Sequence, residues 1–214
     1  MNSDLVAYYK ERAREYEDIY LKPERQEDLR SAATILQDLV KDKTVIEIAC
    51  GTGYWTEQIA QTAEHVFATD INEAVIDIAK QKDIPAGKAS FSVADVYALP
   101  EGKTYDCLFG GFIWSHIPLQ ELDTFISAVN KIVAPGGTVV FMDNNYVAGS
   151  STAISDSDEY GNTFQARELK DGSKHRVLKN FPSEDFLRDK PGGIAGDISI
   201  TRLKYYWILS YRIG

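Results

Sequence analysis

The feature that most constrains this chain is an apolar run that passes through an acid into a glycine-rich turn, Thr44-Val-Ile-Glu-Ile-Ala-Cys-Gly-Thr-Gly53. Its first residues are short, β-branched and apolar, which is typical of a buried parallel strand. Gly51 and Gly53 can adopt positive φ and let a ligand approach the backbone. The residues that follow continue as a helix, whose first N–H groups face the turn. The stretch predicts a strand, a turn and a helix that cradle a ligand.

Two residues help to identify that ligand. A turn that binds a dinucleotide has the pattern G-x-G-x-x-G, but Thr56 occupies the third glycine position here. The charge of Glu47, just before the turn, would oppose a phosphate and suits a ligand with a cationic end. S-adenosylmethionine has a sulfonium and an ammonium group and no phosphate. These residues favour it and disfavour a nicotinamide dehydrogenase.

The segment Glu47-Ile-Ala-Cys-Gly-Thr-Gly53 resembles the first motif of the class I S-adenosylmethionine-dependent methyltransferases, acidic-x-Gly-x-Gly-x-Gly. The resemblance covers about residues 44–145 and implies that Glu47, Ala49, Gly51 and Gly53 contact the cofactor. Ala49 replaces the first glycine. We expect this change to be tolerated, because alanine accepts the extended conformation of a strand end.

The ends of the next two predicted strands also carry acids. Asp70 ends the second strand, where it can accept hydrogen bonds from both ribose hydroxyls, and Ile71 would pack on the adenine ring. Asp95 follows the third strand. The resemblance implies that Asp95 meets the adenine amino group and that the Val96 amide donates to the ring.

The reacting groups are expected after the fourth strand, where the resemblance assigns Phe112 to the cofactor pocket. His116 is the histidine that the motif order places beside the methyl group, so it is the candidate general base. The alternative is that His116 only hydrogen-bonds the backbone and shapes the pocket. The Asn/Asp-Pro-Pro-aromatic sequence of nitrogen methyltransferases acting on adenine or glutamine is absent.

Two segments outside this core are expected to cover it. Helices are predicted at about 4–20 and 24–40, and the tyrosines of the first form one face that is most simply core. In resembling proteins such helices cover the cofactor pocket, so Tyr16 is assigned to the methionine carboxylate. Extended runs at 163–169 and 174–179 flank an Asp-Gly pair and predict a hairpin, either a lid or a structural edge.

Together these elements predict a single methyltransferase domain over residues 1–214, with a Rossmann-like, seven-stranded, mostly parallel sheet, helices on both faces, an antiparallel last strand and an inserted β-hairpin. Its expected parts are a helical cap (1–41), a cofactor-binding core (44–145), an inserted loop and hairpin lid (146–182), and a final helix and strands (183–214). The Pro-Gly-Gly turn before a fifth strand at 138–145 also matches the family.

Composition limits the classes of molecule that this chain is expected to bind. A net charge of −9 disfavours a nucleic-acid groove, which needs clustered Lys and Arg. The two cysteines lack metal-like spacing, so no metal is expected, and they fit a reducing cytoplasm. No signal peptide or apolar run of membrane-spanning length is present, so no membrane partner is expected.

The expected function is methyl transfer from S-adenosylmethionine to a small-molecule acceptor. Positioning alone can provide much of the acceleration. Two alternatives remain at this point. An aminopropyl transferase of the same fold would need acids for a polyamine, for which Asp143 is the only obvious candidate. A non-catalytic S-adenosylmethionine-binding protein would keep the same pocket motifs.

Overall fold

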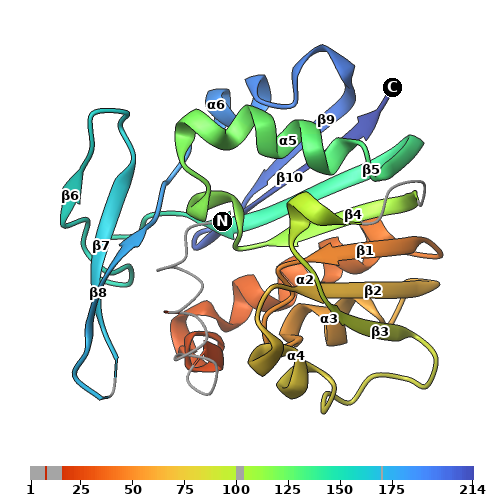
Figure 1. Ribbon diagram of the computed structural model, residues 1–214, viewed down its shortest axis with the longest axis horizontal. Coiled ribbons are helices and arrows are strands. Elements are labelled where there is room, and N and C mark those ends of the chain that lie inside the picture. Colours follow the sequence, from red (N-terminus) through yellow and green to blue (C-terminus); the bar gives the residue numbers. More distant parts are fainter. Residues whose placement is uncertain (1–7, 9–15, 100–103, 170) are drawn as a thin grey trace.

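The computed structural model describes residues 8, 16–99, 104–169 and 171–214, and its centre is a seven-stranded sheet (Figure 1). The strand order is β3-β2-β1-β4-β5-β10-β9, and β10, which pairs antiparallel with both neighbours, is the one strand that runs against the others. The predicted sheet is therefore confirmed. Its strands are β1 (Thr44–Ile48), β2 (His65–Asp70), β3 (Ala89–Val93), β4 (Tyr105–Gly111), β5 (Val133–Asn144), β9 (Ala195–Arg202) and β10 (Tyr206–Ile213).

Helices cover both faces of this sheet (Figure 1). One face packs against α2 (Gln26–Val40), α3 (Tyr54–Ile59) and α4 (Glu73–Ala79), and the other against α5 (Leu122–Asn130) and α6 (Glu184–Asp189). Because side chains alternate across a strand, β1 must be apolar on both sides, and its one acid is exceptional. None of the helices in the described part of the chain combines the length and apolar character that a membrane span requires.

Short 3₁₀ helices connect or extend these elements: η1 (Tyr16–Leu21), η2 (Pro23–Arg25), η3 (Val96–Ala98), η4 (Trp114–His116), η5 (Leu119–Glu121) and η6 (Gly192–Ile194). The helix predicted at 24–40 is thus η2 followed by α2, with Pro23 at the start. The helix predicted at 4–20 falls mostly outside the described residues. Its described end is the 3₁₀ helix η1.

The fifth strand starts earlier than expected, at Val133 instead of Thr138. The Pro-Gly-Gly segment lies within β5, where the pairing with β4 shifts register. A Cβ on Gly137 would lie 2.6 Å from the Val133 side chain, so only glycine fits beside that strand start. The segment acts as an irregularity in the strand rather than as the turn before it.

The predicted hairpin is present and forms a second sheet with β6 (Asp156–Ser157), β7 (Thr163–Glu168) and β8 (Lys174–Leu178). Gly172 adopts a φ of 86° in the turn, and the Ser173 amide donates to Asp171 Oδ1 at 2.8 Å. The small sheet stands beside the main one (Figure 1). Its base is tied to η4, since the Asn180 amide donates to the Ser115 carbonyl at 2.9 Å.

Tyr8 connects the N-terminal segment to the hairpin. Its side chain is 2% exposed and packs with Leu169 and Val177, and its ring centroid lies 5.1 Å from that of His175. The hairpin therefore has a second attachment besides its base.

The expectation for Ala49 is wrong. Its φ is 52°, which is left-handed rather than extended. That conformation explains why a glycine in the motif would suit the position, because an L-residue there costs about 1–2 kcal/mol. Phe112, at the end of β4, also adopts a left-handed φ of 58°. Strained backbone of this kind is typical of functional sites.

Candidate active site

The predicted site residues meet at one edge of the sheet, beyond the carboxyl ends of its parallel strands. In the order β3-β2-β1-β4, the ends carry Asp95, Asp70, the 49–53 loop and Phe112. Asp143 and Asn144 belong to the adjacent end of β5. Ligands of open α/β sheets bind at this edge.

Asp70 holds the glycine loop in place. Its Oδ2 accepts from the Gly51 amide at 3.0 Å, and its Oδ1 accepts from the Asn72 amide at 2.9 Å. The carboxyl is 9% exposed, and burial raises its pKa although these amides act in the opposite direction. Ile71, which is half-buried, follows directly. Asp70 thus links the ends of β1 and β2.

Glu47 is buried on the side of the sheet that faces α3. Its Oε2 accepts from Thr56 Oγ1 at 2.6 Å, and its exposure is 2%. Burial raises the pKa of Glu47 to about 8, an effect that the Thr56 hydroxyl partly offsets. Burial thus favours the protonated form of this carboxyl, whereas the sequence argument took Glu47 as an ionised acid. Thr56, which replaces the third glycine, is its hydrogen-bond partner.

Gly53 is required by packing as well as by its backbone conformation. Its φ is 81°, and an added Cβ would lie 2.9 Å from the Cβ of Ala79 in α4. The first turn of α3 can therefore lie close to α4. This role differs from the ligand approach that the sequence argument gave to Gly53.

The η1 segment lies over the glycine loop. Thr52 Oγ1 donates to Glu17 Oε1 at 2.7 Å, and Glu17 also pairs with Lys82 at 2.7 Å. The Tyr20 ring stacks on Tyr54 with centroids 3.9 Å apart. The N-terminal segment thus covers this edge of the sheet. Tyr16 begins η1, but its side chain lies outside the described part of the structure.

Asp95 and Val96 form the start of η3. The half-buried Asp95 caps this 3₁₀ helix, since its Oδ1 accepts from the Tyr97 amide at 3.0 Å. Among the described residues, none bonds its second carboxylate oxygen. One acceptor atom of Asp95 can therefore meet a ligand without breaking the cap.

A cavity of about 330 Å³ lies beside these strand ends, between the N-terminal segment and the hairpin. Phe112 just after β4, His116 in η4 and Asn144 at the end of β5 line it from the side of the main sheet. Gln165 and Arg167 line it from β7, which makes the hairpin one wall. The volume suits a small molecule.

His116 is 8% exposed, and its Nδ1 lies 2.6 Å from the Leu178 carbonyl. The carbonyl can only accept, so the proton is on Nδ1 and Nε2 is the unprotonated nitrogen. Burial holds the pKa of His116 well below its usual range, and the charge of Lys179 adds to this, whereas Asp143 opposes it. His116 is therefore a neutral imidazole at physiological pH.

Sequence reasoning did not identify Lys179 as a site residue. Lys179 Nζ lies 2.7 Å from Asp143 Oδ1 and donates to Ser115 Oγ at 2.6 Å. Lys179 and Asp143 are 4% and 0% exposed. Burial alone would raise the pKa of Asp143, but Lys179 holds it below its usual range. An acid within the apolar β5 signals that a cation must lie nearby, although the sequence does not say which.

Comparisons with known proteins match this chain to methyltransferases. Residues 45–137 match the model of a methyltransferase domain family. Phosphoethanolamine N-methyltransferase 1 of Zea mays is 29% identical over 105 residues, which are 48% of this chain and 21% of that protein. The chain thus spans about a fifth of that relative's length. An uncharacterized methyltransferase of Bacillus cytotoxicus is 23% identical over 82% of this chain and 81% of its own.

Among solved structures, the complex of DhpI with SAH superposes with a TM-score of 0.80 and 24% identity. The match covers 100% of this chain and 99% of that one. The match therefore spans the chain from end to end, and the overall fold is shared.

Proposed function

We propose that this chain, a member of the class I S-adenosylmethionine-dependent methyltransferases, transfers the methyl group of S-adenosylmethionine to a small-molecule acceptor. The observation that carries the proposal is the row of Asp95, Asp70, the 49–53 loop and Phe112 along one edge of the sheet. Relatives with names of small-molecule methyltransferases support it, among them a ubiquinone biosynthesis O-methyltransferase of Hydrogenovibrio crunogenus that is 28% identical over 112 residues.

The residues at this edge fit the cofactor. Asp70 offers a carboxylate to the ribose and Asp95 has an oxygen left for the adenine amino group. We assign Ile71 and Val96 to the adenine.

The remaining predicted contacts surround the other end of the cofactor. Ala49, Gly51 and Gly53 all have positive φ, which turns the backbone sharply at the end of β1. We assign these residues, with Glu47, Phe112 and Tyr16, to the methionine part. S-adenosylmethionine supplies, when bound, a methyl group on a positively charged sulfur that needs no further activation.

The protein's own residues then position the acceptor. The cavity beside Phe112 is the proposed acceptor pocket. His116 is proposed as the base, because its unprotonated Nε2 can accept a proton from an acceptor hydroxyl. The hairpin is proposed as a lid. Hydrogen exchange at its tip should slow when ligands bind, and an unchanged rate would contradict the lid role.

The aminopropyl transferase alternative loses its main support. Asp143 is already neutralised by Lys179 and is fully buried, so it is poorly placed to bind a polyamine. The other alternative is a non-catalytic binding protein, which would have the same cofactor affinity but no turnover. Transfer of label from methyl-tritiated S-adenosylmethionine to a library of small molecules separates this alternative from an enzyme.

Calorimetry tests the cofactor proposal. Wild-type protein should bind S-adenosylmethionine and S-adenosylhomocysteine, and Asp70→Ala should weaken both about ten- to a hundredfold, since a charge-assisted hydrogen bond is lost. Asp77→Ala, which removes an exposed acid of α4, is the matched control. Unchanged affinity in a folded Asp70→Ala variant would remove Asp70 from the site, and tight binding of NADH by the wild type would overturn the assignment.

A further inference from the structure

We propose that the acceptor is a small oxyanion, a molecule with a phosphate-type or carboxylate group, and that Arg25 with Lys22 holds this group in the cavity. This inference rests on the proposed function, because it concerns the acceptor pocket of the same site. It begins from the charges of the wall. In the described part of the chain, four cationic side chains line the cavity, namely Lys22, Arg25, Arg167 and Lys179.

Among the described residues, the acids of the same wall are fewer and exposed. Asp18 and Glu168 also line the cavity, and both are exposed. The side chain of Glu168 is 62% exposed and lies 3.8 Å from Lys174. Arg25, in contrast, is 6% exposed. Lys179 is paired with the buried Asp143, so Arg25 is the buried cation of the described wall that has no acidic partner among the described residues, in a protein whose net charge is −9. A buried positive charge in the wall of a cavity selects for anions and disfavours amines.

Arg25 is the central residue of this site. Its guanidinium donates to Ser150 Oγ at 3.1 Å and to Asn144 Oδ1 at 3.3 Å, and it lies 5.1 Å from the centre of the Tyr205 ring. These partners are all neutral. No ion pair to Arg25 is found among the described residues, although the exposed Glu24 reaches Ser150 Oγ at 3.1 Å. A buried guanidinium held by neutral groups is well suited to pair with an anionic ligand.

Lys22 lies beside Arg25. Lys22 Nζ donates to the Ser150 carbonyl at 3.1 Å, and Arg25 Nη2 contacts the same oxygen at 3.5 Å. Two positive charges thus converge on one neutral backbone oxygen. An oxyanion at this point would accept from both side chains, which relieves their mutual repulsion. Ser150 belongs to the loop after β5, so the site forms only where that loop meets η2.

The test uses the full chain with and without saturating S-adenosylhomocysteine. Calorimetry would compare inorganic phosphate and acetate with neutral glycerol and cationic ethylamine at matched ionic strength. Saturable binding of either anion, with no binding of the other two probes, is expected. Equal responses to glycerol and to the anions would overturn the proposal. Phosphate binding in the absence of S-adenosylhomocysteine does not depend on the cofactor. A failure of the cofactor proposal can therefore be distinguished from a failure of the anion-site proposal.

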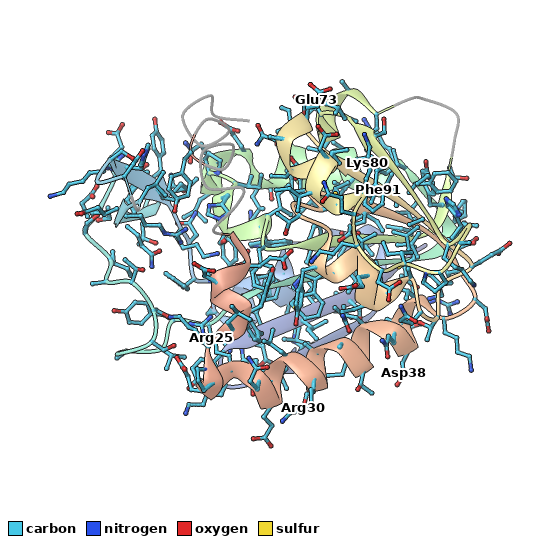
Figure 2. All side chains as sticks on the ribbon, turned by 90° about the horizontal axis from the view of Figure 1, so that it is seen from below. Arg25, Arg30, Asp38, Glu73, Lys80 and Phe91 are labelled. Carbon is cyan, nitrogen blue, oxygen red and sulfur yellow. The ribbon has the colours of Figure 1, made fainter. Side chains whose placement is uncertain are left out.

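Variants then locate the site. Arg25→Gln should weaken anion binding about ten- to a hundredfold. Lys22→Gln changes a half-buried residue and should weaken anion binding about two- to fivefold. If Arg25→Gln does not fold, the Lys22→Gln variant alone tests the location of the site. Arg30→Gln is the control, because Arg30 lies on the solvent side of α2 (Figure 2). Anion affinities in Arg25→Gln and Lys22→Gln equal to that of Arg30→Gln would overturn the assignment.

Discussion

Replacing Lys179 by methionine should destabilise this protein strongly, because it leaves Asp143 buried without its cation. Both side chains are almost fully buried and their charged atoms lie 2.7 Å apart. Breaking such a pair typically costs about 3–5 kcal/mol. The amides of Ser115 and Asn144 continue to bind the carboxylate at 2.9 and 2.7 Å, so we expect a cost near the lower end, about 3 kcal/mol.

Urea denaturation monitored by tryptophan fluorescence measures this cost. With a slope of about 2 kcal/mol/M, the midpoint of Lys179→Met should fall by about 1.5 M at pH 7. Lys190→Met is the matched control, because Lys190 pairs at 2.7 Å with Asp123, which is 77% exposed. Such a surface pair contributes at most about 1 kcal/mol. The double variant Asp143→Asn/Lys179→Met should recover most of the loss.

The pH dependence gives an independent check. In the wild type the folded pKa of Asp143 lies below its usual value, so its stabilising contribution is present at neutral pH and is lost as pH falls through the folded pKa. Without Lys179, burial raises the folded pKa, and protonation then favours the folded state. The difference in unfolding free energy between wild type and Lys179→Met should therefore shrink from pH 7 towards pH 4. A cost below 1 kcal/mol, or a difference that does not change with pH, would refute the reasoning.

Three further predictions concern the strand ends. Ala49→Gly should raise the unfolding free energy by about 0.5–1 kcal/mol, because relief of left-handed strain exceeds the added chain entropy; a loss in urea denaturation would contradict this. Glu47 has a folded pKa of about 8, above its unfolded value. The unfolding free energy of the wild type should therefore fall by about 1 kcal/mol per pH unit between pH 4.5 and 8, relative to that of Glu47→Gln. Parallel pH–stability curves for the two proteins would contradict this. His116→Asn should keep cofactor affinity while turnover falls at least about a hundredfold, and the acidic limb of the wild-type rate profile should lie below pH 6.5; a fall of less than tenfold would leave His116 as scaffold.

The sequence predicted the parts of the site that follow from local pattern. Asp70 and Asp95 stand where apolar strands end, and parallel strands bring their carboxyl ends to one edge. It did not predict Arg25, whose contacts to Ser150 span 125 positions along the chain. Lys179 meets Asp143 across 36 positions, through the inserted hairpin. Local periodicity carries no information on such pairs, since they depend on how a loop folds back.

Backbone conformation was also beyond the sequence argument. Ala49 was expected to be extended because it stands at a strand end, where alanine accepts that conformation, but the turn after β1 imposes a left-handed conformation on this position. The sequence argument for Glu47 also left out the effect of burial. When the strand that carries an acid is covered on both faces, burial raises the pKa of its carboxyl.

The packing of Tyr8 against Leu169 and Val177 has an evolutionary consequence. The N-terminal segment and the hairpin come from distant parts of the chain but meet in a small apolar contact. A lineage that remodels its hairpin to accept a new substrate must also adjust the N-terminal segment, so these three positions should covary among relatives. If the hairpin of this chain were replaced by that of another methyltransferase while its own N-terminal segment was kept, Tyr8 would have no matching surface to pack on.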